Sequence, residues 1–98
     1  MFIQLIDSHM SDLDTALEEL HREWERATDG RNTVRRSITA RDREDERHIV
    51  SLVFFDSYES AMENSNLPET DEMAAKMRTL VDDVSFENLD VIDDRSFT

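Results

Sequence analysis

The chain has 98 residues, a net charge of −13 and no cysteine, a length that suits one domain over residues 1–98 with a modest core. Without cysteine, the chain forms no disulfide, thiol nucleophile or thiolate metal site. The acidic charge disfavours nucleic acid and anionic membranes, and no apolar run approaches the ~20 residues of a membrane span, so we expect a cytoplasmic protein.

The first third of the chain predicts a strand and a helix. Residues 2–6 are mostly apolar and predict a strand that ends near Asp7. Ser11 lies three residues before Asp14, a spacing typical of a helix start. The helix should end at Asp29-Gly30, where glycine adopts the left-handed cap. Its apolar stripe recurs at three- and four-residue steps: Leu13, Ala16, Leu17, Leu20, Trp24 and Ala27.

Two strands joined by a charged turn come next. Residues 33–40 alternate with a period of two, which predicts a strand; Val34, Arg36, Ile38 and Ala40 lie on one face and Thr33, Arg35, Ser37 and Thr39 on the other. Residues 41–47 contain no apolar side chain and predict a solvated hairpin turn, so the flanking strands should pair antiparallel. The second of these strands, His48 to Phe55, is apolar at nearly every position. It therefore needs cover on both of its faces.

A helix with a clear start and stop follows the third strand. Asp56 and Glu59 have the spacing of a capping box, so we expect Asp56 to cap a helix that continues to about Asn64. Pro68 disfavours helical geometry at Leu67 and should break the helix there.

The last third predicts one more helix and one more strand. Thr70 is the expected cap of the helix, which should end at Asp82-Asp83. Residues 86–92 predict the final strand, with Leu89 and Phe86 on opposite faces. Residues 93–98 are expected to form a loose tail.

This order of elements predicts a ferredoxin-like βαββαβ sandwich, an α+β fold in which helices cover one face of a four-stranded antiparallel sheet. The first and third strands are apolar on both faces. A bare second face would expose a larger apolar patch than monomers usually carry. We therefore expect a homodimer through the sheet face, with the two sheets facing each other. A charge at Val53 or Phe54 should disrupt it.

Two segments resemble the antibiotic-biosynthesis-monooxygenase-like domains of the dimeric α/β-barrel superfamily. In HIVSLVFFDSYESAMENSNLPET (48–70) a strand ends in phenylalanine, Asp-Ser-Tyr-Glu opens a helix, and Asn-Ser-Asn-Leu-Pro ends it. FENLDV (86–91) matches the closing strand. The resemblance implies a homodimeric α/β barrel with a pocket between sheet and helices in each subunit. It also implies a group that includes cofactor-independent oxygenases of aromatic polyketides, haem-degrading enzymes, isomerases and cyclases.

Five residues are candidates to line such a pocket around a flat phenolic molecule. Trp24 could stack on the ring, and His48 could act as a general base near neutral pH. Tyr58, Asn64 and Asn66 could donate hydrogen bonds to a developing oxyanion. Each also has a structural interpretation: Trp24 and Tyr58 as packing, the asparagines as turn formers, and His48 as a surface residue.

We expect neither a metal nor a cofactor. The three histidines, His9, His21 and His48, do not have a spacing that indicates a metal site. The haem-degrading proteins that the resemblance includes bind iron through a histidine on the second helical segment. Residues 56–81 contain no histidine, so haem degradation is disfavoured.

Two functions remain open. The first is a homodimeric oxygenase or cyclase that acts on a small aromatic molecule without a cofactor. The alternative is a non-catalytic dimerisation or accessory module of the same fold with no open pocket. An open cavity with polar groups in its wall favours the first, whereas solid packing around Trp24, Tyr58 and residues 64–66 favours the second.

Overall fold

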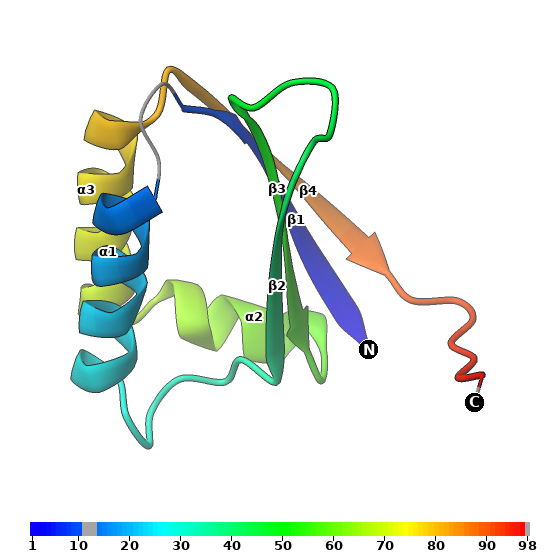
Figure 1. Ribbon diagram of the computed structural model, residues 1–98. Helices are drawn as coiled ribbons and strands as arrows, with labels where there is room; N and C mark the ends of the chain where they lie inside the picture. The colour runs from blue at the N-terminus through cyan, green and yellow to red at the C-terminus, as the bar shows by residue number, and fades with distance from the viewer. Residues whose placement is uncertain (11–13, 98) are drawn as a thin grey trace.

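A four-stranded antiparallel sheet carries helices on one of its faces in the computed structural model, which describes residues 1–10 and 14–97 (Figure 1). The strand order is β2-β3-β1-β4. This is the predicted ferredoxin-like arrangement. The elements are β1 (Phe2–His9), α1 (Asp14–Ala27), β2 (Arg36–Arg41), β3 (His48–Phe55), α2 (Tyr58–Ser65), α3 (Pro68–Leu80) and β4 (Asp83–Asp90).

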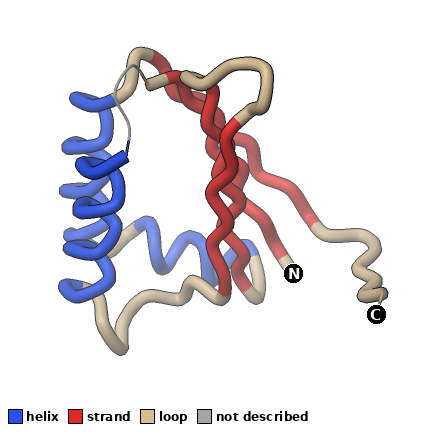
Figure 2. The backbone as a smooth tube through the Cα atoms, viewed as in Figure 1, coloured by secondary structure: helices blue, strands red, loops and turns tan. Residues whose placement is uncertain are grey.

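The helices form a layer that stands away from the middle of the sheet. Figure 2 shows α1 and α3 side by side, while α2 crosses between the two layers at one end. The opposite face of the sheet, which we call the outer face, has no described element over it. None of the described helices is both long enough and apolar enough to span a membrane.

The pairing register decides which side chains share a face. Gln4 pairs with Val53 and lies on the helix side of the sheet, whereas Ile3 pairs with Phe54 on the outer face. Neighbouring residues of one strand point to opposite faces. The expectation that Val53 and Phe54 both meet a partner subunit is therefore wrong for Val53. The larger apolar residues of the outer face are Ile3, Leu5, Ile38, Val50, Leu52, Phe54 and Leu89.

The buried core consists of two clusters at opposite ends of the β1–β3 pair. One contains Phe2, Phe55 and Ala61, with Val34, Val53 and Met62 packed against it. The other contains Met10, Leu17 and Ile49, with Leu80 and Val81 beside it. Because the clusters hold the layers together at their ends, the helices need not touch the centre of the sheet.

Both predicted caps of the later helices are wrong. Ser57 caps α2, since its hydroxyl accepts from the backbone N–H of Ser60 at 3.1 Å. Asp56, one residue earlier, instead accepts from the Arg35 guanidinium at 2.7 and 3.0 Å. α3 begins at Pro68 without a side-chain cap, because the residue before it, Leu67, has no side-chain oxygen to accept a hydrogen bond.

Several element ends also differ from the predictions, and the reason is pairing across the sheet. β1 continues to His9 because that residue pairs with His48 on one side and Asp83 on the other. β4 accordingly begins at Asp83 and ends at Asp90, and α3 ends earlier, at Leu80.

The other differences are small. β2 begins later than expected, at Arg36, and Val34 packs against the Phe2 cluster. α1 ends at Ala27, and Gly30 in the following turn has a φ of 77°, the left-handed conformation that glycine adopts without strain. The proposed cap Ser11 and the stripe residue Leu13 lie outside the described residues. Phe86 and Leu89 lie on opposite faces of β4, as predicted.

Candidate functional site

A cavity of about 430 Å³ lies between the sheet and helices α1 and α3. Its floor is the helix side of β1 and β3, where Ser8 and Ser51 carry short side chains that leave space below the helices. Its volume falls within the range of small-molecule sites in proteins. The lining residues with a direct role below are His21, Trp24, Glu25, Ser51, Asn64 and Thr70.

A second hollow of about 390 Å³ adjoins this cavity between α1 and β2. The two share Leu17, His21 and Ile49 in their walls. Glu18 and Arg41 line only the second hollow, which we call the mouth. A small molecule could therefore reach the cavity between α1 and the β2 edge of the sheet.

Trp24, a candidate from the sequence, lies in the wall of the cavity. Its Nε1–H donates to the Thr70 hydroxyl at 3.0 Å, and this bond joins α1 to the first turn of α3. Thr70 does not cap α3, because the helix already begins at Pro68 and Thr70 lies in its first turn. The Trp24–Thr70 hydrogen bond satisfies the polar edge of the indole, so the half-buried ring can contribute apolar surface to the cavity.

Asn64 also lies in the cavity wall, near the end of α2, and is only 7% exposed. Its Oδ1 accepts from the backbone N–H of Thr33 at 3.4 Å. Its NH₂ group makes no hydrogen bond with any other residue that the structure describes. Asn64 therefore offers a side-chain donor at the cavity wall.

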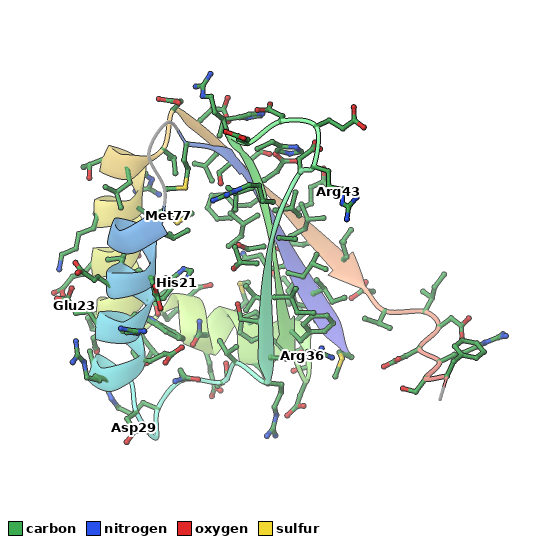
Figure 3. All side chains as sticks on the ribbon, viewed as in Figure 1. His21, Glu23, Asp29, Arg36, Arg43 and Met77 are labelled. Carbon is green, nitrogen blue, oxygen red and sulfur yellow. The ribbon has the colours of Figure 1, made fainter. Side chains whose placement is uncertain are left out.

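His21 is the cavity residue that sequence reasoning missed, since it was considered only as a metal ligand. Figure 3 shows His21 and Met77 projecting from the helices toward the sheet. Burial lowers the pKa of His21, and the nearby Glu25 carboxylate partly offsets this effect. The signal was present in the sequence, because His21 lies three residues before Trp24 and four after Leu17, on the buried stripe of the helix.

The other three candidates lie outside the cavity, and two of them are on or near α2. Tyr58 is 50% exposed and packs edge-on against Phe2, with ring centroids 5.5 Å apart. Asn66 follows α2 as an exposed residue whose backbone N–H donates to Met62 at 3.0 Å. These positions correspond to their structural interpretations as packing and helix-end residues.

His48 lies on the outer face of the sheet. Its ring nitrogens contact Asp42 and Asp7, both at 2.9 Å, and these carboxylates raise its pKa, the Asp42 hydrogen bond most. Its ring stacks on that of His9 with centroids 4.9 Å apart. Two of the three histidines thus converge, which their spacing did not indicate. Even so, within residues 1–10 and 14–97 no group of three or more His, Asp or Glu side chains is arranged to hold a metal.

The similarity to known proteins is one of fold. No family model matches the chain, and no curated protein matches it. A candidate antibiotic biosynthesis monooxygenase from Deinococcus radiodurans is 16% identical with a TM-score of 0.77, over 100% of this chain and 99% of that one. A mutant of SnoaB, a cofactor-independent oxygenase from Streptomyces nogalater, is 12% identical with a TM-score of 0.80, over 95% and 94%.

A candidate monooxygenase from Chloroflexus aurantiacus is 18% identical with a TM-score of 0.70, over 98% of both chains. These structures cover nearly the whole chain at low identity. The chain therefore has the fold of the antibiotic-biosynthesis-monooxygenase domains.

Proposed function

We propose that this chain is a homodimeric domain that binds a small aromatic molecule between its sheet and helices and acts on it as a cofactor-independent oxygenase or cyclase. The cavity of about 430 Å³ is the observation that carries this proposal. The fold shared with SnoaB, described as a cofactor-independent oxygenase, adds support at the level of architecture.

The composition of the cavity wall favours a flat, mainly apolar ligand with one or two polar substituents. Val53, Met73 and Met77 contribute apolar surface, and the Trp24 ring lies beside them in the wall. The Asn64 NH₂ group and the His21 imidazole are polar groups without a hydrogen-bond partner among the described residues. Such a wall is typical of sites that bind an aromatic body by burial and orient it by a few hydrogen bonds.

The alternative of a non-catalytic module with a filled core has less support. It required Trp24, Tyr58 and residues 64–66 to pack solidly with no cavity. Tyr58 does pack against Phe2, and Asn66 lies outside the cavity, but Trp24 and Asn64 line a cavity that adjoins an open mouth.

The homodimer is proposed from the outer face of the sheet. Apolar side chains from all four strands lie there without cover from any described element, with Leu52 between Leu5 and Ile38 near the centre. A second copy related by a two-fold axis would cover this surface with the same residues.

Binding is tested first, because Trp24 is the single tryptophan and therefore reports on the cavity. We expect dihydroxyanthraquinone to quench Trp24 fluorescence with a saturable dependence on concentration. Ser51→Phe, which places a ring on the cavity floor, should weaken binding by at least about tenfold, the effect of 1.4 kcal/mol. Ser96→Phe, on the exposed C-terminal segment, is the matched control and should bind like the unaltered protein.

Turnover is tested with the corresponding dihydroxyanthrone, which O₂ oxidises to the anthraquinone and water. The unaltered protein should accelerate quinone formation over buffer and over the Ser51→Phe variant, as followed by absorbance. Saturable binding without acceleration would refute oxygenation while leaving a binding domain. No quenching by the anthraquinone in a folded protein would refute the proposed use of the cavity.

A further inference from the structure

The chain carries three histidines, and His21 differs from the other two in its surroundings. His48 is held between two carboxylates, and His9 contacts Asp83 at 2.8 Å, both outside the cavity. His21 makes no hydrogen bond or ion pair with another residue in the described part of the chain. We propose that His21 accepts the proton of a phenolic or enolic hydroxyl group on the ligand in the cavity. This inference rests on the proposed function, because it requires a ligand of that class.

The position of His21 suits this role. It lies in the walls of both the cavity and the mouth, so a ligand that enters between α1 and β2 passes its imidazole. The side chain projects from α1 toward the sheet (Figure 3). A group at the boundary between an apolar cavity and solvent can receive a proton from the ligand and later release it to water.

The hydrogen-bonding state of His21 also suits it. A neutral imidazole has one nitrogen that donates and one that accepts. Neither nitrogen is engaged by another described residue, so the accepting nitrogen is available to a ligand hydroxyl. Burial lowers the pKa of His21, so the ring is neutral and able to accept a proton at pH 7.

The charged groups around His21 favour the imidazolium once it has formed. Glu25 lies one turn further along α1 in the cavity wall, and Glu18 lies in the wall of the mouth. Arg41 of β2 also lines the mouth but already has an interaction partner. The residues of β1, β3 and α3 that line the cavity are uncharged.

The far wall of the cavity contains two arginines, Arg35 and Arg36. Arg35 is paired with Asp56. On α1, the Glu18 carboxylate is already paired with the Arg22 guanidinium at 2.6 Å. Glu25 raises the pKa of His21 and is therefore the carboxylate that stabilises a proton on its ring.

The step moves one proton and requires no oxidant. The O–H bond of the ligand breaks, an N–H bond forms on the imidazole, and the electron pair stays on the ligand oxygen as a phenolate. The product is a phenolate–imidazolium pair, and an electron-rich phenolate is the form of an aromatic ring that reacts with an electrophile. Desolvation of the pair in an apolar cavity strengthens its mutual attraction.

The ionisation of bound dihydroxyanthraquinone tests this inference, because the phenol and the phenolate absorb at different wavelengths. In the unaltered protein, we expect the ionisation equilibrium of the bound probe to shift by at least about tenfold toward the phenolate, one pKa unit. His21→Gln should bind the probe without that shift. His48→Gln is the matched control on the outer face and should retain the shift.

A second measurement on the unaltered protein does not depend on how the variants fold. The ring resonances of His21, followed by NMR, should show a higher pKa with the probe bound than without it. An equal shift in the absorbance of His21→Gln, or an unchanged His21 pKa on binding, would overturn the role of His21 while leaving the cavity as a binding site. If the unaltered protein bound no probe in either form, the proposed function would fail, and the role of His21 with it.

Discussion

A charge at the centre of the outer face should separate the proposed dimer, and Leu52→Asp is the sharpest form of this change. Leu52 pairs with Leu5 of β1 and Ile38 of β2, so apolar strands flank it on both sides. Its side chain is half-buried in a single copy, and the outer face around it has no described cover. In a two-fold dimer the substitution acts twice, because both copies present the same surface.

The size of the effect follows from two contributions in each copy. Loss of leucine burial costs about 2 kcal/mol. An unpaired carboxylate taken out of water costs about 3 kcal/mol more. Over both copies the dimer loses about 10 kcal/mol, so a nanomolar dimer would dissociate completely at micromolar concentration.

Sedimentation at about 10 μM distinguishes the two states, with Leu52→Met as the control that keeps the surface apolar. We expect a dimer for the unaltered protein and the control, and a folded monomer for Leu52→Asp. Phe54→Asp should behave like Leu52→Asp, since Phe54 shares the outer face. A monomeric unaltered protein at this concentration, or a dimeric Leu52→Asp variant, would refute the assignment of the outer face as the interface.

Four further predictions concern the core, the pH dependence of two histidines, and haem. Phe55→Ala should lower the free energy of unfolding, measured in urea, by about 3–5 kcal/mol. The reason is that the Phe55 side chain is only 2% exposed and packs with Phe2 and Ala61. A loss below about 1 kcal/mol would contradict this prediction. The carboxylates of Asp42 and Asp7 raise the pKa of His48 above 6.5. The stabilisation from His48 is therefore full below pH 6.5 and is lost as the pH rises through the folded-state pKa. The stability difference between the unaltered protein and His48→Gln should shrink over that pH range, and a constant difference would contradict the prediction. Burial lowers the pKa of His21, so the opposite sign applies: stability falls as the pH drops below 6.5, and His21→Gln should reduce that fall. The protein should show no Soret band at one haem per chain, because α2 and α3 carry no histidine; a sharp band at that ratio would show the prediction wrong.

The order of elements could be predicted from the sequence because the signals are local. The apolar run 48–55, the helical stripe through Leu17 and Trp24, and the charged turn at 41–47 each specify one element without reference to the rest of the chain. The predicted ends were less accurate, since the lengths of β1 and β4 depend on pairing with residues 74 to 88 positions away, from His9 with Asp83 to Phe2 with Asp90. The predicted cap of α2, Asp56, was wrong by one residue, because Asp56 forms an ion pair with Arg35 and Ser57 caps the helix.

The candidate site was predictable only in part: the helical period indicates the position of Trp24, whereas the position of His48 could not be decided from the sequence. Trp24 lies on the buried stripe of α1, so the helical period alone directs it inward, and the same period would have found His21. His48 occupies the same face of β3 as Leu52 and Phe54, but alternation cannot say which of the two apolar faces receives the helices. Its role as a cavity base therefore depended on a fact that only the assembled sheet contains.

The chain's amino-acid order thus determined the elements, their succession and the presence of two apolar faces on β3, because periodicity and turn chemistry act over a few residues. The tertiary structure alone decided that a cavity remains between the layers. Its volume depends on short side chains such as Ser51 meeting helices that the two core clusters hold apart at their ends. The distance between two packed layers is a property of many side chains together, and no local pattern encodes it.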